Sequence, residues 1–231
     1  LMRLDKPIGI YLLLWPSICG VLIAGLNNSF SINSVLIVTF GAILVRTCGC
    51  VINDIFDYKI DMQVSRTSDR PLANGSISIL NAYILFFLLA ISSLTLLYFV
   101  PTITKVISLI TGILIVIYPL TKRFMGIPQI FLGITFAAGT LISYSLESSN
   151  FTPSIIIFYI GIVSWIIAFD TVYALQDIED DQLINNNSSA VFWGRKTSIM
   201  VDIFYLIFFI CLVIIGFINK FSPLFYIFIL G

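Results

Sequence analysis

The feature that most constrains this chain is a series of apolar runs that recur along its whole length. About 20 apolar residues in a helix cross the roughly 30 Å hydrocarbon core of a bilayer. Backbone polar groups within lipid must be paired inside their own segment, so runs of this kind form helices. Charged residues make up only 10% of the chain, whereas soluble domains carry about 25%. The sequence therefore predicts an all-α integral membrane protein built as a multi-span helical bundle.

Seven of the runs are long enough to span the bilayer, and we expect about seven to eight spans in this chain. The expected spans are Ile8–Leu26, Ile32–Ile52, Ile77–Val100, Ile103–Leu120, Ile127–Tyr144, Ser154–Thr171 and Thr197–Ile218. A further apolar run, 221–231, stops too soon to cross, so we expect the carboxyl-terminal end to be incomplete. Residues 1–231 are expected to form a single transmembrane domain.

The positions of the cations predict the orientation in the membrane. Lys and Arg accumulate in cytoplasmic loops, and most of the 12 cations precede the first span or lie in alternate loops after it. These cations are Arg3, Lys6, Lys59, Arg66, Arg70, Lys122, Arg123, Arg195 and Lys196. We therefore expect the amino terminus to be cytoplasmic, in a bacterial inner membrane. The formal net charge is zero, and the lipid bilayer, not a nucleic acid, is the expected surrounding partner.

The first acidic motif follows the second expected span and contains Asn53, Asp54, Asp57 and Asp61. At about 100° per residue, positions 54, 57 and 61 lie along one face of a continued helix. Carboxylates this close repel one another unless a cation lies among them. Mg²⁺ prefers a few carboxylates together with oxygens of a substrate phosphate. The motif therefore predicts a magnesium site.

The second acidic motif repeats this spacing at the end of the sixth expected span, with Asp170, Tyr173, Asp177 and Asp181 on one helical face. Both motifs are expected on the same membrane face, where two such faces can clamp a pyrophosphate through bridging ions. The alternative is that they are solvated helix ends, where acids are common. Acids near hydrocarbon are costly without a functional partner, which favours the functional interpretation.

Basic residues complete the pattern. Arg66 and Arg70 follow the first motif, and Lys122 and Arg123 end the fourth span. Cations suit an anionic diphosphate, and Arg can bind phosphate in a bidentate manner, although all four also fit a cytoplasmic topology signal. Arg46 lies inside the second span, where charges are rarely idle. It could receive the carboxylate of a small acidic acceptor or pair with an acid on a neighbouring helix.

Together these residues resemble the UbiA family of membrane prenyltransferases, in particular its 4-hydroxybenzoate polyprenyltransferase branch. The resemblance covers residues 4 to 181 in the expected order. It is carried by Leu4-Asp5-Lys6-Pro7, Leu14-Trp15-Pro16, Arg46, Asn53-Asp54-x-x-Asp57-x-x-x-Asp61, Arg66-Thr67-x-x-Arg70-Pro71-Leu72, Tyr118-Pro119-Leu120-Thr121-Lys122-Arg123, Pro128-Gln129 with Leu132-Gly133, and Asp170-Thr171-x-Tyr173-Ala174-x-x-Asp177-x-x-Asp180-Asp181.

The resemblance implies a bundle of nine spans around a central cavity. It also implies Mg²⁺-dependent transfer of a polyprenyl chain from polyprenyl pyrophosphate to the ring of 4-hydroxybenzoate, in ubiquinone biosynthesis. The metal-binding candidates are Asn53, Asp57, Asp61, Asp177 and Asp181. The catalytic candidates are Asp54, Asp57, Asp61, Asp170, Asp177 and Asp181. The substrate-binding candidates are Arg46, Arg66, Arg70, Tyr118, Lys122, Arg123 and Tyr173, of which Arg46 would face the aromatic acid.

One departure from the family pattern lies after the second motif, where a Gly-x-Lys-Ser turn is replaced by Asn185-Asn186-Asn187-Ser188-Ser189. The change removes a cation expected near the diphosphate, for which Arg195 or Lys196 could compensate. In the reaction, Tyr118 and Tyr173 could stabilise an allylic cation through their ring faces, and Asp170, phosphate or water could accept the ring proton.

Two alternative functions stay open at this point. A sibling enzyme of the family would act on another acceptor, such as dihydroxynaphthoate, haem or a chlorin. A membrane cation transporter would need ionisable residues spread through the midplane of several spans, whereas the acids here gather at one face.

Overall fold

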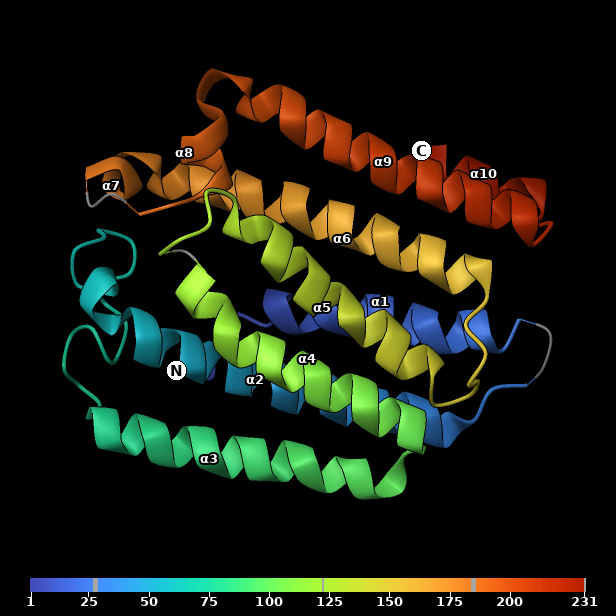
Figure 1. The fold of residues 1–231 in the computed structure, drawn as a ribbon, viewed down its shortest axis with the longest axis horizontal. Coiled ribbons are helices and arrows are strands. Elements are labelled where there is room, and N and C mark those ends of the chain that lie inside the picture. The colour runs from blue at the N-terminus through green and yellow to red at the C-terminus, as the bar shows by residue number, and fades with distance from the viewer. Residues whose placement is uncertain (27–28, 122, 184–185, 231) are drawn as a thin grey trace.

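The computed structural model describes residues 1–26, 29–121, 123–183 and 186–230, and every regular element in those ranges is a helix (Figure 1). This confirms the predicted all-α class. The long helices are α1 (Ile8–Ala24), α2 (Ile32–Asp61), α3 (Ile79–Leu96), α4 (Thr102–Thr121), α5 (Pro128–Tyr144), α6 (Pro153–Ala174) and α9 (Thr197–Ile218). The short elements are η1 (Leu97–Phe99), η2 (Leu175–Asp177), α7 (Ile178–Leu183), α8 (Ser189–Trp193), η3 (Gly194–Lys196) and α10 (Pro223–Leu230).

The helices fit the predicted number of spans. Five helical segments of the described chain are long and apolar enough to cross a membrane. The two shorter apolar helices, α1 and α5, have 17 residues each, which is at the lower limit of about 17 residues for a span. The apolar part of the second span was predicted to end at Ile52, and α2 continues beyond it through the first acidic motif to Asp61, as the continued helix predicted for that motif requires.

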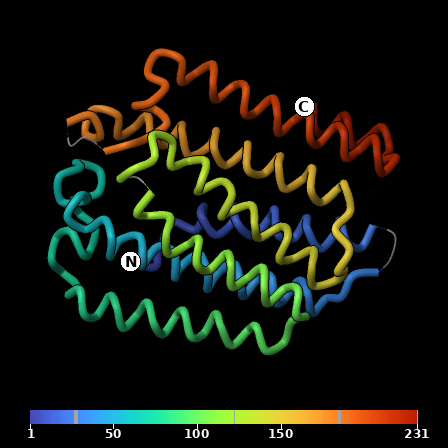
Figure 2. The backbone as a smooth tube through the Cα atoms, viewed as in Figure 1, coloured from blue at the N-terminus to red at the C-terminus, as the bar shows by residue number. Residues whose placement is uncertain are grey.

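Successive long helices run in opposite directions, and the tube in Figure 2 shows how this sorts the motifs. One end of the bundle carries the carboxyl end of α2, the α2–α3 loop, the end of α6, and α7 and α8. We call this the acidic end, because it holds the motifs at 53–61 and 170–181. The opposite end carries the α3–α4, α5–α6 and α9–α10 connections.

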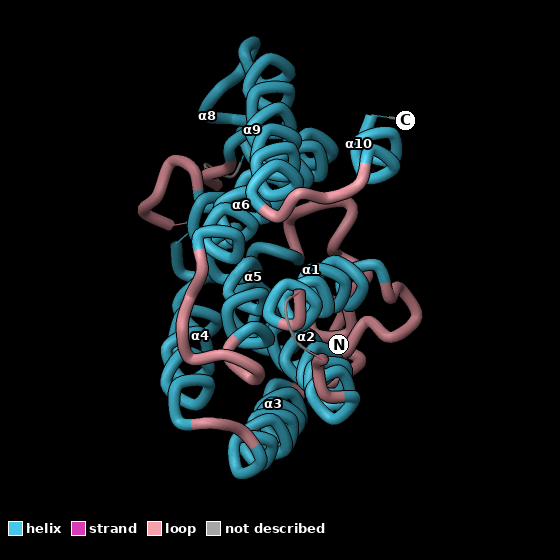
Figure 3. The backbone as a smooth tube through the Cα atoms, turned by 90° about the vertical axis from the view of Figure 1, so that its right-hand side faces the viewer, coloured by secondary structure: helices cyan, strands magenta, loops and turns pink. Residues whose placement is uncertain are grey.

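The core is formed mainly where α6 packs against α5 and α9, and α1 against α5 and α2. Ile155, Ile162 and Ile166 of α6 are buried with Tyr144 and Ile215 in the largest apolar cluster described. Figure 3 looks along the helices and shows α3 and α9 at opposite edges of the bundle. Large side chains on the outer helices, among them Phe87, Leu88, Ile91 and Ile113, are exposed. Apolar side chains on an outward face indicate contact with lipid.

Close packing of α1 on α5 depends on Gly20. A Cβ atom there would lie 2.5 Å from the carbonyl oxygen of Thr140, whereas a Cβ at Gly112 of α4 would have nothing within 4 Å. We expect Gly20→Ala to lower the free energy of unfolding by about 1–3 kcal/mol, because overpacking forces the backbones apart. The matched Gly112→Ala change is expected to raise it by up to about 1 kcal/mol, because Ala favours helix. Thermal unfolding in detergent measures both, and equal shifts would contradict the packing argument.

Candidate active site

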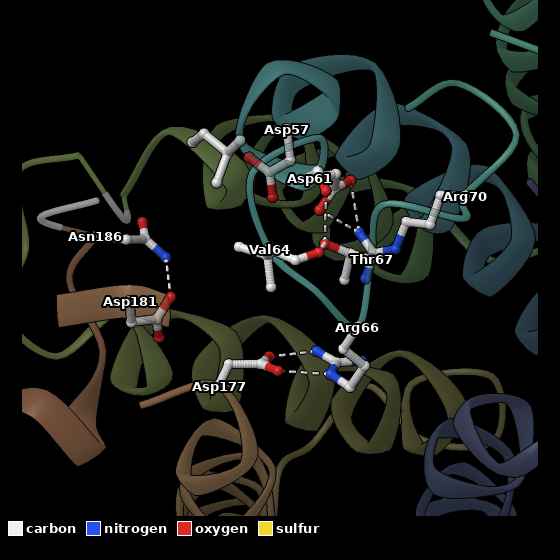
Figure 4. Close-up of a pocket in the computed structure, with 10 residues that line it drawn as sticks. Asp57, Asp61, Val64, Arg66, Thr67, Arg70, Asp177, Asp181 and Asn186 are labelled. Carbon is white, nitrogen blue, oxygen red and sulfur yellow. Dashed lines mark hydrogen bonds and ion pairs between the residues drawn. The ribbon is translucent and has the colours of Figure 1, made fainter. Parts of the chain in front are cut away.

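The two acidic motifs meet around one small cavity at the acidic end (Figure 4). The cavity has a volume of about 70 Å³. Its lining residues are Asp57, Ile60, Asp61, Val64, Arg66, Thr67, Arg70, Asp177, Asp181 and Asn186. The first motif reaches it because α2 does not stop at the end of its apolar part, and the second because η2 and α7 extend α6. The structure thus brings together four of the predicted carboxylates.

The α2–α3 loop is joined to the second motif by two neighbouring residues. The Arg66 guanidinium pairs with both carboxylate oxygens of Asp177, and Nε donates to Oδ1 over 2.7 Å. The backbone N–H of Ser65 donates to Oδ2 of Asp180 over 2.9 Å. The hydrogen bond to Asp177 raises the pKa of Arg66 above its ordinary value, so the guanidinium is charged at every practical pH. These contacts join the α2–α3 loop, which follows the first motif, to the second motif.

The first motif has its own arginine partners. Nη1 of Arg70 donates to both oxygens of Asp61, over 2.8 and 2.7 Å, and lies 3.4 Å from Oδ1 of Asp54. Arg3, in the segment before α1, also donates to Oδ1 of Asp54. Asp54 is 1% exposed and does not line the cavity. Of the three acids predicted on one helical face, only Asp57 and Asp61 line the cavity, and Asp54 shares Arg70 with Asp61.

Hydrogen bonds between helices fix the second motif. The Asn186 side chain donates to Oδ1 of Asp181 over 2.8 Å. Between α6 and α8, the hydroxyls of Thr171 and Ser189 lie 2.7 Å apart. Between α8 and α5, the Ser189 N–H donates to the Gln129 side chain over 2.9 Å. These three residues are buried. Because buried polar groups need partners, this network sets where α6 ends relative to α5 and α8.

Several predicted site residues do not line this cavity. Those described are Arg46, Asn53, Tyr118, Arg123, Asp170 and Tyr173. Arg123 is exposed, and its guanidinium donates to the carbonyl of Phe56 over 3.3 Å. Arg195 and Lys196, the cations considered as replacements for the family lysine, are exposed and also lie outside the lining. Lys122 and Asn185 are outside the described residues.

Arg46 lies where the second span was predicted to hold it. Its guanidinium carbon is 5.4 Å from the ring centre of Phe136 on α5. In the described ranges no Asp or Glu forms an ion pair with Arg46. The pairing with an acid of a neighbouring helix, considered as an alternative from sequence, is therefore not seen there.

Sequence reasoning missed two contacts that shape the site. Arg3 was counted only as a topology cation, yet it contacts the first motif. Asp180 was quoted within the second motif without a role, yet it binds the backbone of Ser65. A signal existed for Asp180 in its spacing of three residues from Asp177, because such residues are neighbours on a helix surface. No local pattern connects residue 3 with residue 54.

The donor set fits a hard divalent cation by its chemistry, because four carboxylates line the cavity, while their present spacing is not that of a metal site. Within the described part of the chain no group of three or more His, Cys, Asp or Glu side chains is close enough to hold a metal ion. Asp61 and Asp177 are instead held by guanidinium groups, which supply positive charge where a cation would. Four carboxylates and two guanidiniums line the cavity, which leaves an excess of negative charge. Carboxylate oxygens of this kind are the protein ligands that Mg²⁺ prefers.

Known proteins resemble this chain in sequence over most of its length. A sequence model of the UbiA prenyltransferase family matches residues 13–231. A 4-hydroxybenzoate octaprenyltransferase of Francisella tularensis subsp. mediasiatica (strain FSC147) is 38% identical over 226 residues, covering 98% of this chain and 79% of the relative. One from Legionella pneumophila (strain Corby) is 38% identical over 221 residues, covering 95% of this chain and 77% of the relative.

Solved structures share the fold at lower identity. The apo structure of a UbiA homolog from Aeropyrum pernix K1 superimposes with a TM-score of 0.84 at 19% identity, covering 98% of this chain and 84% of that one. A UbiA homolog from Archaeoglobus fulgidus bound to GPP and Mg²⁺ gives 0.80 at 19% identity, covering 99% and 84%. The family match extends over most of the sequence and the relatives over nearly all of it. This chain belongs to the UbiA prenyltransferase family of integral membrane proteins.

Proposed function

We propose that this chain transfers a polyprenyl group from polyprenyl pyrophosphate to the aromatic ring of 4-hydroxybenzoate, a step in ubiquinone biosynthesis. The observation that carries the proposal is the meeting of Asp57, Asp61, Asp177 and Asp181 around one cavity with Arg66 and Arg70. Relatives at 38% identity are named 4-hydroxybenzoate octaprenyltransferase. We propose that residues 1–231 belong to one transmembrane prenyltransferase domain.

Mg²⁺ is the proposed cofactor. Asp57, Asp61, Asp177 and Asp181 would hold it at the cavity, with Asn53 as a candidate outside the lining. When bound, the ion neutralises the diphosphate and favours its departure as a leaving group. The homolog from Archaeoglobus fulgidus binds GPP together with Mg²⁺, which supports a metal-dependent site in the family.

The residues of the chain have distinct tasks in this proposal. The carbon–oxygen bond of the prenyl diphosphate breaks, and its electron pair stays on the diphosphate. A ring carbon of the acceptor then attacks the allylic cation and loses its proton to the released diphosphate, to water or to Asp170. Arg66 lies at the cavity and can leave Asp177 to bind the diphosphate as negative charge develops. Guanidinium groups fixed beside a departing anion stabilise the transition state more than the ground state. Arg70 keeps Asp61 in place.

The proposed location is the bacterial inner membrane, with the acidic end facing the cytoplasm. Arg66, Arg70, Arg123, Arg195 and Lys196 all belong to connections or helix starts at that end. Cytoplasmic connections carry an excess of Lys and Arg. Both substrates would then meet the enzyme from the cytoplasmic side, and the prenyl tail would extend among the apolar helices.

The experiment that tests the function is a membrane assay with 4-hydroxybenzoate and a polyprenyl pyrophosphate, with and without Mg²⁺, that follows the prenylated acid. Mg²⁺-dependent product is the expected result. Turnover of dihydroxynaphthoate or a haem precursor with none of 4-hydroxybenzoate would overturn the acceptor and keep the family reaction. Transport of a cation without prenyl transfer would overturn the enzyme assignment.

Arg46 is proposed to bind the carboxylate of the acceptor, because it is a cation within the second span without an ion-pair partner in the described ranges. We expect Arg46→Gln to raise the KM for 4-hydroxybenzoate about tenfold to a hundredfold, since a hydrogen bond to a charged group contributes about 1.5–3 kcal/mol. The KM for the prenyl pyrophosphate in the same variant is the internal control and is expected to stay unchanged. Equal rises in both constants would contradict the role.

A further inference from the structure

Asp54 is the one carboxylate of the first motif that does not line the cavity, and its burial requires explanation. It is 1% exposed and does not line the cavity that Asp57 and Asp61 share. A buried carboxylate is costly unless it is paired with a cation. Two cations reach it, Arg3 in close contact and Arg70 at 3.4 Å.

The segment before α1 is built to deliver Arg3 to that place. Leu1 and Met2 pack against the apolar cluster that includes Val51 and Ile55 of α2. Arg3 then adopts a φ of 54°, a left-handed conformation that is unfavourable for a residue with a side chain. Its carbonyl accepts a hydrogen bond from the Lys6 N–H over 3.1 Å. A conformation of this cost persists where surrounding contacts fix it, and here the ion pair with Asp54 is one of those contacts.

Arg3 and Arg70 divide two carboxylates between them. Arg70 directs its short hydrogen bonds, 2.7 and 2.8 Å, to Asp61 and only a long contact of 3.4 Å to Asp54. The series Arg3–Asp54–Arg70–Asp61 is balanced in charge. If a neutral residue replaced Arg3, the buried Asp54 would need Arg70 as its main partner. Asp61 at the cavity would then lose its pairing with Arg70.

We propose that Arg3 is a positioning residue for the prenyl-transfer site. By neutralising Asp54, Arg3 keeps Arg70 paired with Asp61. It thereby holds in place a carboxylate and a guanidinium of the cavity that would receive the metal and the diphosphate. The inference rests on the proposed function for its readout, but Arg3 lies outside the cavity lining. Its one described ion pair is with Asp54, which links it to Arg70.

The test is a double-mutant cycle between positions 3 and 54, with the wild-type protein assayed first. Arg3→Gln is expected to raise the KM for the prenyl pyrophosphate about tenfold to a hundredfold, because loss of a supporting partner has an effect of this size in metal sites. Calorimetry is expected to show binding of inorganic pyrophosphate with Mg²⁺ weakened by the same factor. The KM for 4-hydroxybenzoate is expected to stay unchanged. In an Asp54→Asn background the same Arg3 change is expected to have less than a twofold effect, because a neutral side chain at 54 needs no cation.

Two further variants keep the cycle interpretable. Arg3→Lys retains a cation and is expected to fall between wild type and Arg3→Gln, which also serves if the Gln variant does not fold. Lys6→Gln removes an exposed cation from the same segment and is expected to leave both constants unchanged.

An unaltered KM for the prenyl pyrophosphate in Arg3→Gln, or the same rise in the Asp54→Asn background, would overturn the positioning role. Absence of prenyl transfer by the wild-type protein would instead count against the proposed function, so the two failures are distinguishable.

Discussion

Asp57→Asn and Asp177→Asn are each expected to lower kcat/KM for prenyl transfer by about 10³-fold, at the upper end of the effect of removing one charge-stabilising group from an active site. Asp57 belongs to α2 and Asp177 to η2, and both line the cavity. Asparagine has a similar shape but removes the negative charge, so the measured loss reports on charge. Rates at several Mg²⁺ concentrations would show whether extra metal recovers part of the activity, as expected for a weakened metal site.

Asp69→Asn is the matched control. Asp69 is an exposed carboxylate in the same α2–α3 loop as Arg66, and it does not line the cavity. We expect this variant to keep wild-type kcat/KM. Full activity in either cavity variant would remove that carboxylate from the site, and an equal loss in Asp69→Asn would show that any charge in this region matters, whatever its position.

Removal of divalent metal with EDTA is expected to reduce prenyl transfer to background, with recovery on addition of excess Mg²⁺.

The ion pair between Arg66 and Asp177 predicts that the metal and the diphosphate assist each other's binding. Asp177 is held by Arg66, so an ion arriving alone must displace a guanidinium, whereas a diphosphate gives that guanidinium a new acceptor. We therefore expect Mg²⁺ and inorganic pyrophosphate each to bind at least about tenfold more tightly when the other is present, a coupling of about 1.4 kcal/mol.

Calorimetric titration of each ligand in the presence and absence of the other measures this coupling. In Arg66→Gln the coupling is expected to shrink, because Asp177 no longer has a competing partner. Independent binding of the two ligands to the wild-type protein would contradict the exchange of partners at Asp177.

The spans were predictable because hydrophobicity alone defines them. The seventh, Thr197–Ile218, was predicted with the bounds that the structure has. The second apolar span was predicted to end at Ile52 with its helix continuing through the acids, and α2 does continue to Asp61, because charged residues end an apolar run without ending a helix. Backbone hydrogen bonding, together with side-chain partners such as Arg70 for Asp61, decides where the helix stops.

The site was predictable in its parts more than in its assembly. The spacing of the acids correctly grouped Asp57 with Asp61 and Asp177 with Asp181 as residues of one cavity. Asp54, predicted on the same helical face, does not line the cavity, since a helical face is wide and neighbouring elements decide which part of it is buried. The Arg3–Asp54 contact joins residues far apart in sequence, so only tertiary packing could reveal it. Gln129, quoted from a family motif, acquired a physical role only through its hydrogen bond to Ser189.

The pairing of Arg66 with Asp177 has a consequence for the end of the reaction cycle. In the proposed reaction the pyrophosphate product would hold Arg66 and the cavity acids apart, and the resting ion pair would re-form only as that product departs. Asp177 then competes with pyrophosphate for Arg66, and it does so at a high effective concentration because it belongs to the same chain. The Arg66–Asp177 pair is therefore expected to favour release of the pyrophosphate product, because Asp177 offers Arg66 a partner as soon as the product begins to depart.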